Sequence, residues 1–287
     1  MRRTVRLILG AAALLALAPA PLVSADAVPQ RVVSINLCAD ELLIALADPE
    51  QVADLSIYAT DPNLAFLADE AKRFRHDAGA AETVVAMAPD LVLAGRFSKR
   101  ETRATLTTLG YRLVELEPAR SIADSIAEIR KIASLLGHPE RGEALISRID
   151  EARDRAAAAA SSGSESRRSV VVYLRRGYVT GSDTLTDELL SLVGLDNAGS
   201  RLAGRTGGVV PLEKLVAAPP DYLLVSSRQA PAEDQGSALL AHPALAALFP
   251  PEKRIALPDR LTVCGGPSLP AALDWLAGEA RRVEGHP

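Results

Sequence analysis

The sequence predicts an α/β protein made of two Rossmann-like lobes with parallel sheets, joined by one long backbone helix, with a ligand cleft between the lobes. Strand and helix patterns alternate in both halves of the chain, one motif occurs in each half, and a long helical pattern lies between the halves. Alternating strands and helices form right-handed βαβ units and therefore a parallel sheet. Ligands of such sheets bind beyond the carboxyl ends of the strands, so two facing edges form a cleft.

The alternation is clearest at the start of each half. Short runs rich in Val and Ile predict buried strands, and apolar residues at helical spacing predict the helices between them. Asp40 is a candidate cap of the first helix, and Gly194 ends a later one. The expected elements are strands over residues 31–35, 52–57 and 169–174 and helices over residues 40–47 and 185–193.

The repeated motif runs from a Glu to a Pro-Asp pair and on into an apolar strand. Residues 82–94 read ETVVAMAPDLVLA, and residues 213–225 read EKLVAAPPDYLLV. In each copy the Glu opens a short helix near its positive end, Pro stops that helix, and Asp leads into a buried parallel strand. Two copies in corresponding places indicate two lobes built on one plan.

The segment between the halves predicts one long helix over residues 121–160. Its Ile and Leu residues recur at helical spacing, and Gly137-His138-Pro139 interrupts the pattern where we expect a kink. The alternative is an ordinary crossover helix, but the segment far exceeds the roughly 10–15 residues of such helices. The chain is therefore divided into a leader (1–25), an N-terminal lobe (26–120), the connecting helix (121–160) and a C-terminal lobe (161–287).

The leader has the pattern of a cleaved signal peptide. Three arginines, at positions 2, 3 and 6, precede an apolar run over residues 7–18, and Val23-Ser24-Ala25 carries the small residues of a cleavage site. Roughly 12 apolar residues are too few to span a bilayer. No Cys follows at the position that would carry a lipid anchor. We expect the mature protein to be exported and soluble.

Composition excludes several classes of protein. Hydrophobic residues make up 48% and charged residues 24%, so each lobe can bury a core, while aromatic residues at 3% argue against a surface of stacked rings. Cleavage of the leader removes three Arg and no acid, which leaves 29 basic against 36 acidic residues and a formal charge of −7. Because phosphate binding needs a basic face, we expect no nucleic-acid partner.

The two cysteines, Cys38 and Cys264, follow predicted strands of opposite lobes. An oxidising compartment would join a close pair, and a bridge requires Cα atoms within about 7 Å. The alternatives are buried small residues and contacts to the ligand. We favour unbridged thiols that face the cleft, because a bridge would restrict the motion of the lobes.

Six segments spread over the mature chain carry a resemblance to a known family. They are VVSINL (32–37), ELLIAL (41–46), PDLVL (89–93), GSDTLTDELL (181–190), GLDNA (194–198) and the tail over 264–276. In this order they resemble the periplasmic binding proteins with a single backbone helix that serve iron-siderophore, haem and cobalamin importers. The resemblance implies a periplasmic substrate-binding component of an ABC importer, which works as a monomer with a membrane permease.

The resemblance also implies a role for the acids that open the two repeats. In that family a Glu on each lobe docks onto arginines of the permease, and the matching residues are Glu82 and Glu213. The plainer alternative is a first-turn acid that favours its helix by about 0.3–1 kcal/mol. The occurrence of both acids at equivalent places favours docking.

Residues just after strand ends are expected to line the cleft. Tyr58 stands where the family often presents a stacking aromatic side chain. Arg offers a planar fork suited to carboxylate, catecholate or phosphate oxygens, and the alternative for each Arg is a solvated surface charge. The candidate ligand-binding residues are Asn36, Leu37, Cys38, Tyr58, Arg96, Phe97, Arg175, Arg176, Tyr178, Ser227, Arg228 and Cys264.

An Arg-lined cleft in an acidic chain favours an anionic metal chelate, a ferric siderophore first. Cobalamin and haem are the alternatives, with Tyr58 or Tyr178 as an axial ligand of haem. Some positions that are aromatic in cobalamin-binding members of the family hold Gly95 or Arg here. Direct metal capture is not expected, since the four His lie in unrelated contexts, and no cofactor is expected either.

Two other classes of function remain as alternatives. An α/β hydrolase would use Cys264 with His242, but Gly-x-Ser-x-Gly, Gly-x-Gly-x-x-Gly and Walker motifs are absent, so we expect no enzyme. A sensory module would share the lobes and dock a receptor. For a binding protein we expect only a small closure on the ligand, because the long helix makes a large hinge motion costly.

Overall fold

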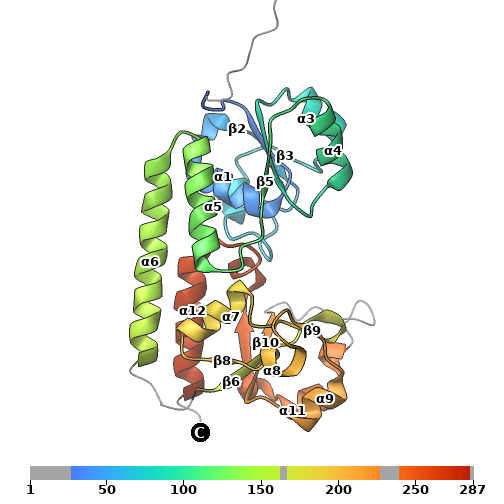
Figure 1. The fold of residues 1–287 in the computed structure, drawn as a ribbon, viewed down its shortest axis with the longest axis vertical. Coiled ribbons are helices and arrows are strands. Elements are labelled where there is room, and N and C mark those ends of the chain that lie inside the picture. Colours follow the sequence, from blue (N-terminus) through green and yellow to red (C-terminus); the bar gives the residue numbers. More distant parts are fainter. Residues whose placement is uncertain (1–26, 162–166, 227–238, 285–287) are drawn as a thin grey trace, which may run out of the picture.

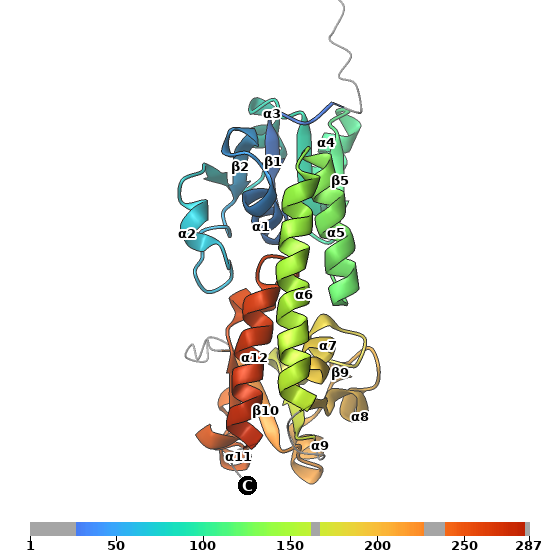
Figure 2. The same cartoon turned by 90° about the vertical axis from the view of Figure 1, so that its left-hand side faces the viewer.

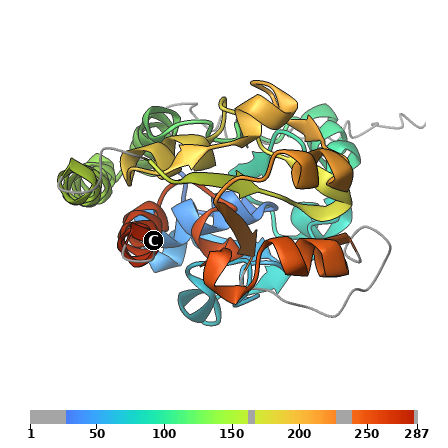
Figure 3. The same cartoon turned by 90° about the horizontal axis from the view of Figure 1, so that it is seen from below.

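The computed structural model describes residues 27–161, 167–226 and 239–284, and it consists of two sheet-bearing lobes that lie one above the other along the long axis (Figure 1). Two long helices, α6 (Pro139–Ser161) and α12 (Leu269–Glu284), lie side by side along one flank of the molecule (Figures 2 and 3). The two parallel-sheet lobes confirm the predicted fold class.

The N-terminal lobe is a five-stranded parallel sheet in the order β3-β2-β1-β4-β5. Its strands are apolar and buried in the centre, as β4 is along its whole length, because helices cover both faces. The elements are β1 (Val32–Ser34), α1 (Leu37–Leu46), η1 (Pro49–Gln51), β2 (Val52–Ser56), α2 (Ala68–Ala71), β3 (His76–Asp77), α3 (Ala81–Ala86), β4 (Leu91–Gly95), α4 (Arg100–Thr108) and β5 (Leu113–Leu116).

The C-terminal lobe has a four-stranded parallel sheet in the order β11-β10-β6-β8 and a two-stranded antiparallel sheet of β7 and β9. Its elements are β6 (Ser169–Val172), η2 (Arg175–Gly177), β7 (Tyr178–Val179), α7 (Leu185–Leu192), β8 (Asp196–Asn197), α8 (Gly199–Ala203), β9 (Gly208–Val209), α9 (Leu212–Ala217), β10 (Tyr222–Ser226), η3 (Leu239–Ala241), α11 (Pro243–Leu248), η4 (Pro251–Lys253), β11 (Arg254–Leu257), η5 (Asp259–Leu261) and α12.

The two parallel sheets share one topology. Read in chain order, β1, β2, β4 and β5 of the first lobe correspond to β6, β8, β10 and β11 of the second. In both sheets the first strand pairs with the second on one side and the third on the other, and β3 is the one addition of the N-terminal lobe among the described strands. The lobes are therefore two versions of one plan, as the repeated motif predicts.

The Asp of each repeat performs the same task in its lobe. The Asp90 carboxylate accepts hydrogen bonds from the backbone N–H groups of Gln30 (2.7 Å) and Arg31 (3.0 Å), just before β1. The Asp221 carboxylate accepts from the N–H (2.8 Å) and the hydroxyl (2.8 Å) of Ser169, the first residue of β6. Each Asp thus ties the entry of the third strand to the entry of the first, because an unpaired N–H there would be costly.

The single kinked helix expected over residues 121–160 is wrong: the segment folds into two helices, α5 (Ile122–Leu135) and α6, packed against each other. The chain reverses at Gly137, whose φ of 84° is a left-handed conformation that favours glycine. The N–H of His138 then closes the turn on the carbonyl of Ala133 (2.8 Å). Of these two helices, α6 runs past both lobes and α5 does not (Figure 2), so α6 is the connecting helix.

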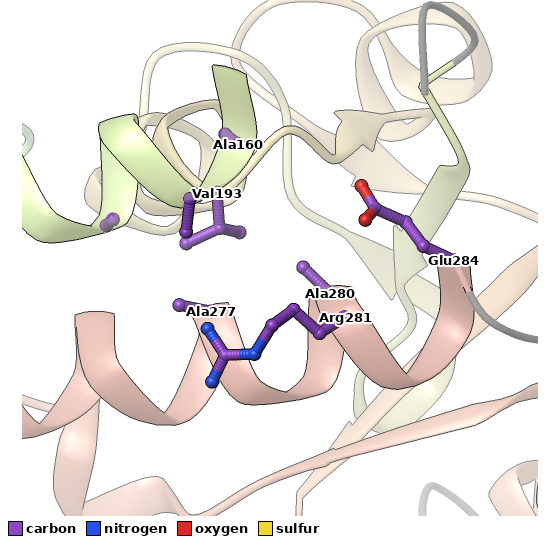
Figure 4. A pocket seen from close by; sticks show the side chains of 8 residues that line it. Ala160, Val193, Ala277, Ala280, Arg281 and Glu284 are labelled. Atoms are coloured by element: carbon purple, nitrogen blue, oxygen red, sulfur yellow. The ribbon is translucent and has the colours of Figure 1, made fainter. Parts of the chain in front are cut away.

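The flank formed by α6 and α12 joins the cores of the two lobes. One continuous buried cluster contains Leu43 from α1, Ile149 from α6, Leu190 from α7 and Leu273 from α12. Near their ends, α6 and α12 approach through small side chains such as Ala160 and Ala277, around a space of about 10 Å³ (Figure 4). That space holds at most about one water molecule. The contact is packing between helices and not a ligand site.

Candidate functional site

The carboxyl ends of the two sheets meet at a disulfide. Cys38 lies in the first turn of α1, directly after β1, and Cys264 lies in the loop over residues 262–268 that follows η5. Their Cα atoms are 5.3 Å apart and their sulfur atoms are bonded. The expectation of unbridged thiols is therefore wrong, and both cysteines of the chain are oxidised.

The position of this loop explains the error. Residues 262–268, here called the crossing loop, leave the C-terminal lobe and pack on the N-terminal one. A Cβ at Gly265 would collide with the Ser125 hydroxyl of α5, and one at Gly266 would lie 3.2 Å from Leu42 of α1. The bridge therefore joins the crossing loop to a helix against which the loop already packs.

A second polar contact joins the lobes close to this region. The backbone N–H of Ile122, at the start of α5, donates to the carboxylate of Glu188 on α7 (2.8 Å). A carboxylate at the positive end of a helix is favourable. This contact joins the two lobes in addition to α6 and the crossing loop.

Asn36 and Leu37, both predicted to line the cleft, have structural roles. The Asn36 side chain caps α1, since its oxygen accepts from the N–H groups of Cys38 (3.0 Å) and Ala39 (3.3 Å). Leu37 is only 8% exposed and packs in a small apolar cluster with Ala65 and Cys264. Leu37 is therefore not a surface residue of the site, and Asp40, the candidate cap, is not the cap.

Asp40 and Glu41 are buried acids that the sequence did not reveal as part of this region. The Asp40 carboxylate accepts from the N–H (3.0 Å) and the hydroxyl (2.5 Å) of Ser56, and the Glu41 carboxylate accepts from the N–H of Phe66 (2.6 Å). Burial raises the pKa of Asp40 to about 6 and that of Glu41 to about 7, although these hydrogen bonds oppose the rise. Their apolar neighbours in the ELLIAL run were the only available signal.

Three aromatic side chains predicted for the site are exposed. Tyr58 is 48% exposed after β2, Phe97 is 80% exposed after β4, and Tyr178 is 40% exposed at the start of β7. The Tyr178 hydroxyl donates to the Thr206 carbonyl (3.2 Å), and Val209, also exposed, lies opposite Tyr178 on β9. Such exposed aromatic and aliphatic groups offer apolar contact area to a ligand.

The arginines predicted for the site differ in their surroundings. Arg96 forms an ion pair with Glu117 (2.7 Å) and lies over the Phe97 ring at 5.8 Å, so its charge is already balanced. Arg175 and Arg176 are exposed on η2, directly after β6, where Arg176 has a left-handed φ of 59°. Ser227 and Arg228 lie outside the described residues.

The metal chemistry of the described residues is limited. In residues 27–161, 167–226 and 239–284 no three His, Cys, Asp or Glu side chains gather in a way that could hold a metal ion. Within the same ranges no helix has the length and apolar character needed to cross a bilayer. The His242 ring accepts from the N–H of Ala244 and caps α11, and the Cys264 sulfur is bonded to Cys38, so the proposed Cys-His nucleophile pair does not exist.

Glu82 and Glu213 occupy equivalent positions on the two lobes. Each is exposed in the first turn of a short helix, Glu82 on α3 and Glu213 on α9. Both helices lie on the side of the molecule away from α6 (Figure 1). The two acids are therefore exposed residues of helices that lie on the same side of the molecule, one in each lobe.

Two parallel-sheet lobes with facing carboxyl edges and one spanning helix define a bilobal binding protein. A family model described as periplasmic binding protein matches residues 32–250. The chain therefore belongs to the periplasmic binding protein family, which is a family of substrate-binding proteins and not of enzymes.

Relatives of known name support this membership. A cobalamin-binding protein of Halobacterium salinarum is 27% identical over 229 residues, covering 76% of this chain and 60% of the relative. A vitamin B12-binding protein of Pectobacterium carotovorum is 26% identical over 183 residues, covering 61% of this chain and 63% of the relative. The chain thus spans only about three fifths of the length of these relatives.

Solved structures confirm the fold. The periplasmic haem-binding protein RhuT of Roseiflexus sp. RS-1 superposes with a TM-score of 0.70 at 24% identity, covering 89% of this chain and 98% of that one. The vitamin B12-binding protein BtuF of Vibrio cholerae superposes with a TM-score of 0.66 at 16% identity, covering 89% of this chain and 98% of that one. At these identities the likeness establishes the fold alone.

Proposed function

We propose that this protein is the periplasmic substrate-binding component of an ABC importer, which binds a metal chelate between its lobes and delivers it to a membrane permease. The observation that carries the proposal is the meeting of the two carboxyl edges, where exposed aromatic and Arg side chains follow strands of both lobes. Residues 1–25 are taken as the cleaved leader that exports it, and the protein acts as a monomer.

For the ligand we propose an anionic metal chelate, with a ferric siderophore as the first candidate. Arg175 and Arg176 are exposed after β6 and suit carboxylate or catecholate oxygens. A tetrapyrrole, haem or cobalamin, is the second candidate. It is favoured by the exposed rings of Tyr58, Phe97 and Tyr178 and by what the relatives are named to bind.

The ligand proposal is tested by titrating the mature protein with a ferric tris-catecholate, hemin and cyanocobalamin, followed by calorimetry and by absorption of the chelate. We expect one of them to saturate at one molecule per protein. The double variant Arg175→Ala/Arg176→Asn should weaken that binding by at least about tenfold, because each charged hydrogen bond contributes about 1.5–3 kcal/mol. Asn is used at position 176 because it tolerates the left-handed backbone.

The matched control is Arg148→Ala, which removes an exposed charge from α6 on the opposite flank and should leave affinity unchanged. If none of the three chelates binds the unaltered protein, the metal-chelate proposal is wrong. If a chelate binds and the Arg175/Arg176 double variant binds it as tightly as the unaltered protein does, these two arginines do not form the site.

The docking role of Glu82 and Glu213 is tested by reversing both charges. We expect Glu82→Lys/Glu213→Lys to abolish uptake of the identified chelate in cells, because lysines would repel a basic surface on the permease. Ligand affinity of the purified variant should stay unchanged. The control Glu140→Lys/Glu151→Lys makes the same change of charge on α6, and uptake should persist. Normal uptake by the Glu82/Glu213 variant would refute docking through these acids.

A further inference from the structure

Helix α1 holds both ends of the segment that carries Tyr58. This segment, residues 57–65 and here called the Tyr58 segment, leaves β2 after Ser56 and returns at Phe66. Ser56 donates hydrogen bonds to the Asp40 carboxylate from its N–H and its hydroxyl, and Phe66 donates one to the Glu41 carboxylate from its N–H. Two consecutive acids of α1 therefore accept hydrogen bonds from the residues that flank the segment on either side.

The bond at Ser56 reaches Tyr58 itself. The Ser56 hydroxyl donates to Asp40 and at the same time accepts from the backbone N–H of Tyr58 (3.3 Å). This relay runs from the carboxylate through one hydroxyl to the main chain of the exposed aromatic residue. Chains of hydrogen bonds strengthen one another in a buried setting, and Asp40, Glu41 and Ser56 are all buried.

The far end of the segment packs against a cysteine of the disulfide. Ala65 packs in one apolar cluster with Leu37 of α1 and with Cys264 of the crossing loop. Helix α1 carries Cys38 as well, so one rigid element binds the Tyr58 segment through Asp40 and Glu41 and the crossing loop through the disulfide. The Tyr58 segment and the crossing loop are thereby set relative to each other.

The cost of burying these two carboxyl groups indicates that their role is to accept hydrogen bonds. A buried carboxyl is costly, and Glu41 Oε2 has no hydrogen-bond partner among the described residues. An apolar residue at position 41 would fit the surrounding ELLIAL run and avoid that cost, but it would leave the Phe66 N–H without its acceptor.

We infer that Asp40 and Glu41 are positioning residues, which hold the Tyr58 segment in the conformation that the ligand meets. The part of this inference that concerns the ligand rests on the proposed function; the part that concerns the segment does not. A segment held in its binding conformation in advance binds more tightly, because the apparent dissociation constant rises as the competent fraction falls.

The experiment measures hydrogen–deuterium exchange of the full mature protein by mass spectrometry, in the peptides that cover residues 57–66. In Glu41→Leu, which removes the acceptor, exchange in these peptides should rise by about tenfold, as expected for the loss of a buried hydrogen bond. Glu41→Gln keeps an acceptor oxygen and should stay close to the unaltered protein. Ser56→Ala removes the relay without touching α1, and it should raise exchange near Tyr58 even if Glu41→Leu does not fold.

The peptides of β6, in the other lobe, control for general unfolding and should not change. Unchanged exchange over 57–66 in Ser56→Ala would refute the inference. The inference would also be refuted if the exchange of residues 57–66 rose as much in Glu41→Gln as in Glu41→Leu, or if the exchange of β6 rose along with it.

Hemin, cyanocobalamin and the ferric tris-catecholate are then titrated against the same variants. The chelate that binds the unaltered protein should lose affinity several-fold in Glu41→Leu and Ser56→Ala but not in Glu41→Gln. If none of them binds the unaltered protein, the proposed function fails while the exchange result still decides the positioning role.

Discussion

Replacing Cys38 and Cys264 together by alanine is expected to lower the free energy of unfolding by about 3–5 kcal/mol, because the bridge closes a loop between residues 226 apart. Closing so long a loop removes much of the freedom of the unfolded chain. The folded protein loses little else, since Ala fills most of the space of a Cys in the apolar cluster around Leu37. Chemical denaturation followed by circular dichroism measures the change.

The same prediction can be checked without mutation. Reduction of the unaltered protein should destabilise it by nearly the same amount, while the double Ala variant should not respond to reductant at all. If the Ala variant is as stable as the oxidised protein, the bridge does not stabilise the folded chain. Ligand affinity of the variant shows in addition whether the crossing loop must be tied to α1 for binding.

Replacing Glu41 by Gln is expected to change how stability depends on pH. Burial raises the pKa of Glu41 from 4.5 to about 7, so the folded protein holds this proton more tightly than the unfolded chain does. The resulting stability is fully present below the unfolded pKa of 4.5 and is lost as the pH rises through 4.5 to about 7. Gln carries no titrating proton and has no such loss.

Relative to the unaltered protein, the free energy of unfolding of the variant should therefore rise by about 3 kcal/mol between pH 4.5 and neutral pH, because burial raises the pKa of Glu41 from 4.5 to about 7. Denaturation curves over this range measure the difference. Glu70→Gln, on the exposed face of α2, is the matched control and should follow the unaltered protein. Parallel pH profiles for Glu41→Gln and the unaltered protein would contradict a buried, proton-binding Glu41.

Local patterns in the sequence were enough to predict most of the two-lobe fold. The apolar strands over 91–95 and 222–226 are each preceded by a short helix and a Pro-Asp pair, and these features depend on residues a few positions apart. The same locality explains why Tyr58 and Phe97 are exposed, since a residue just after a buried strand emerges at the sheet edge.

Two errors arose because the local pattern does not show where the chain reverses or which way a side chain points. The pattern over 121–160 is the same for one long helix and for two helices folded back on each other, and the left-handed turn at Gly137 decides between them. Leu37 follows a strand like the other site residues, yet it lies in the first turn of a capped helix and points into an apolar cluster.

The sequence by itself determined the number of lobes, their common topology and the exposed acids that open the repeats, because each depends on short-range periodicity. Only the tertiary structure decided the Cys38–Cys264 bridge, the burial of Asp40 and Glu41 and the path of the crossing loop. These depend on which distant segments pack together, and a carboxyl or a thiol has no local pattern that reports its neighbours across 226 residues of chain.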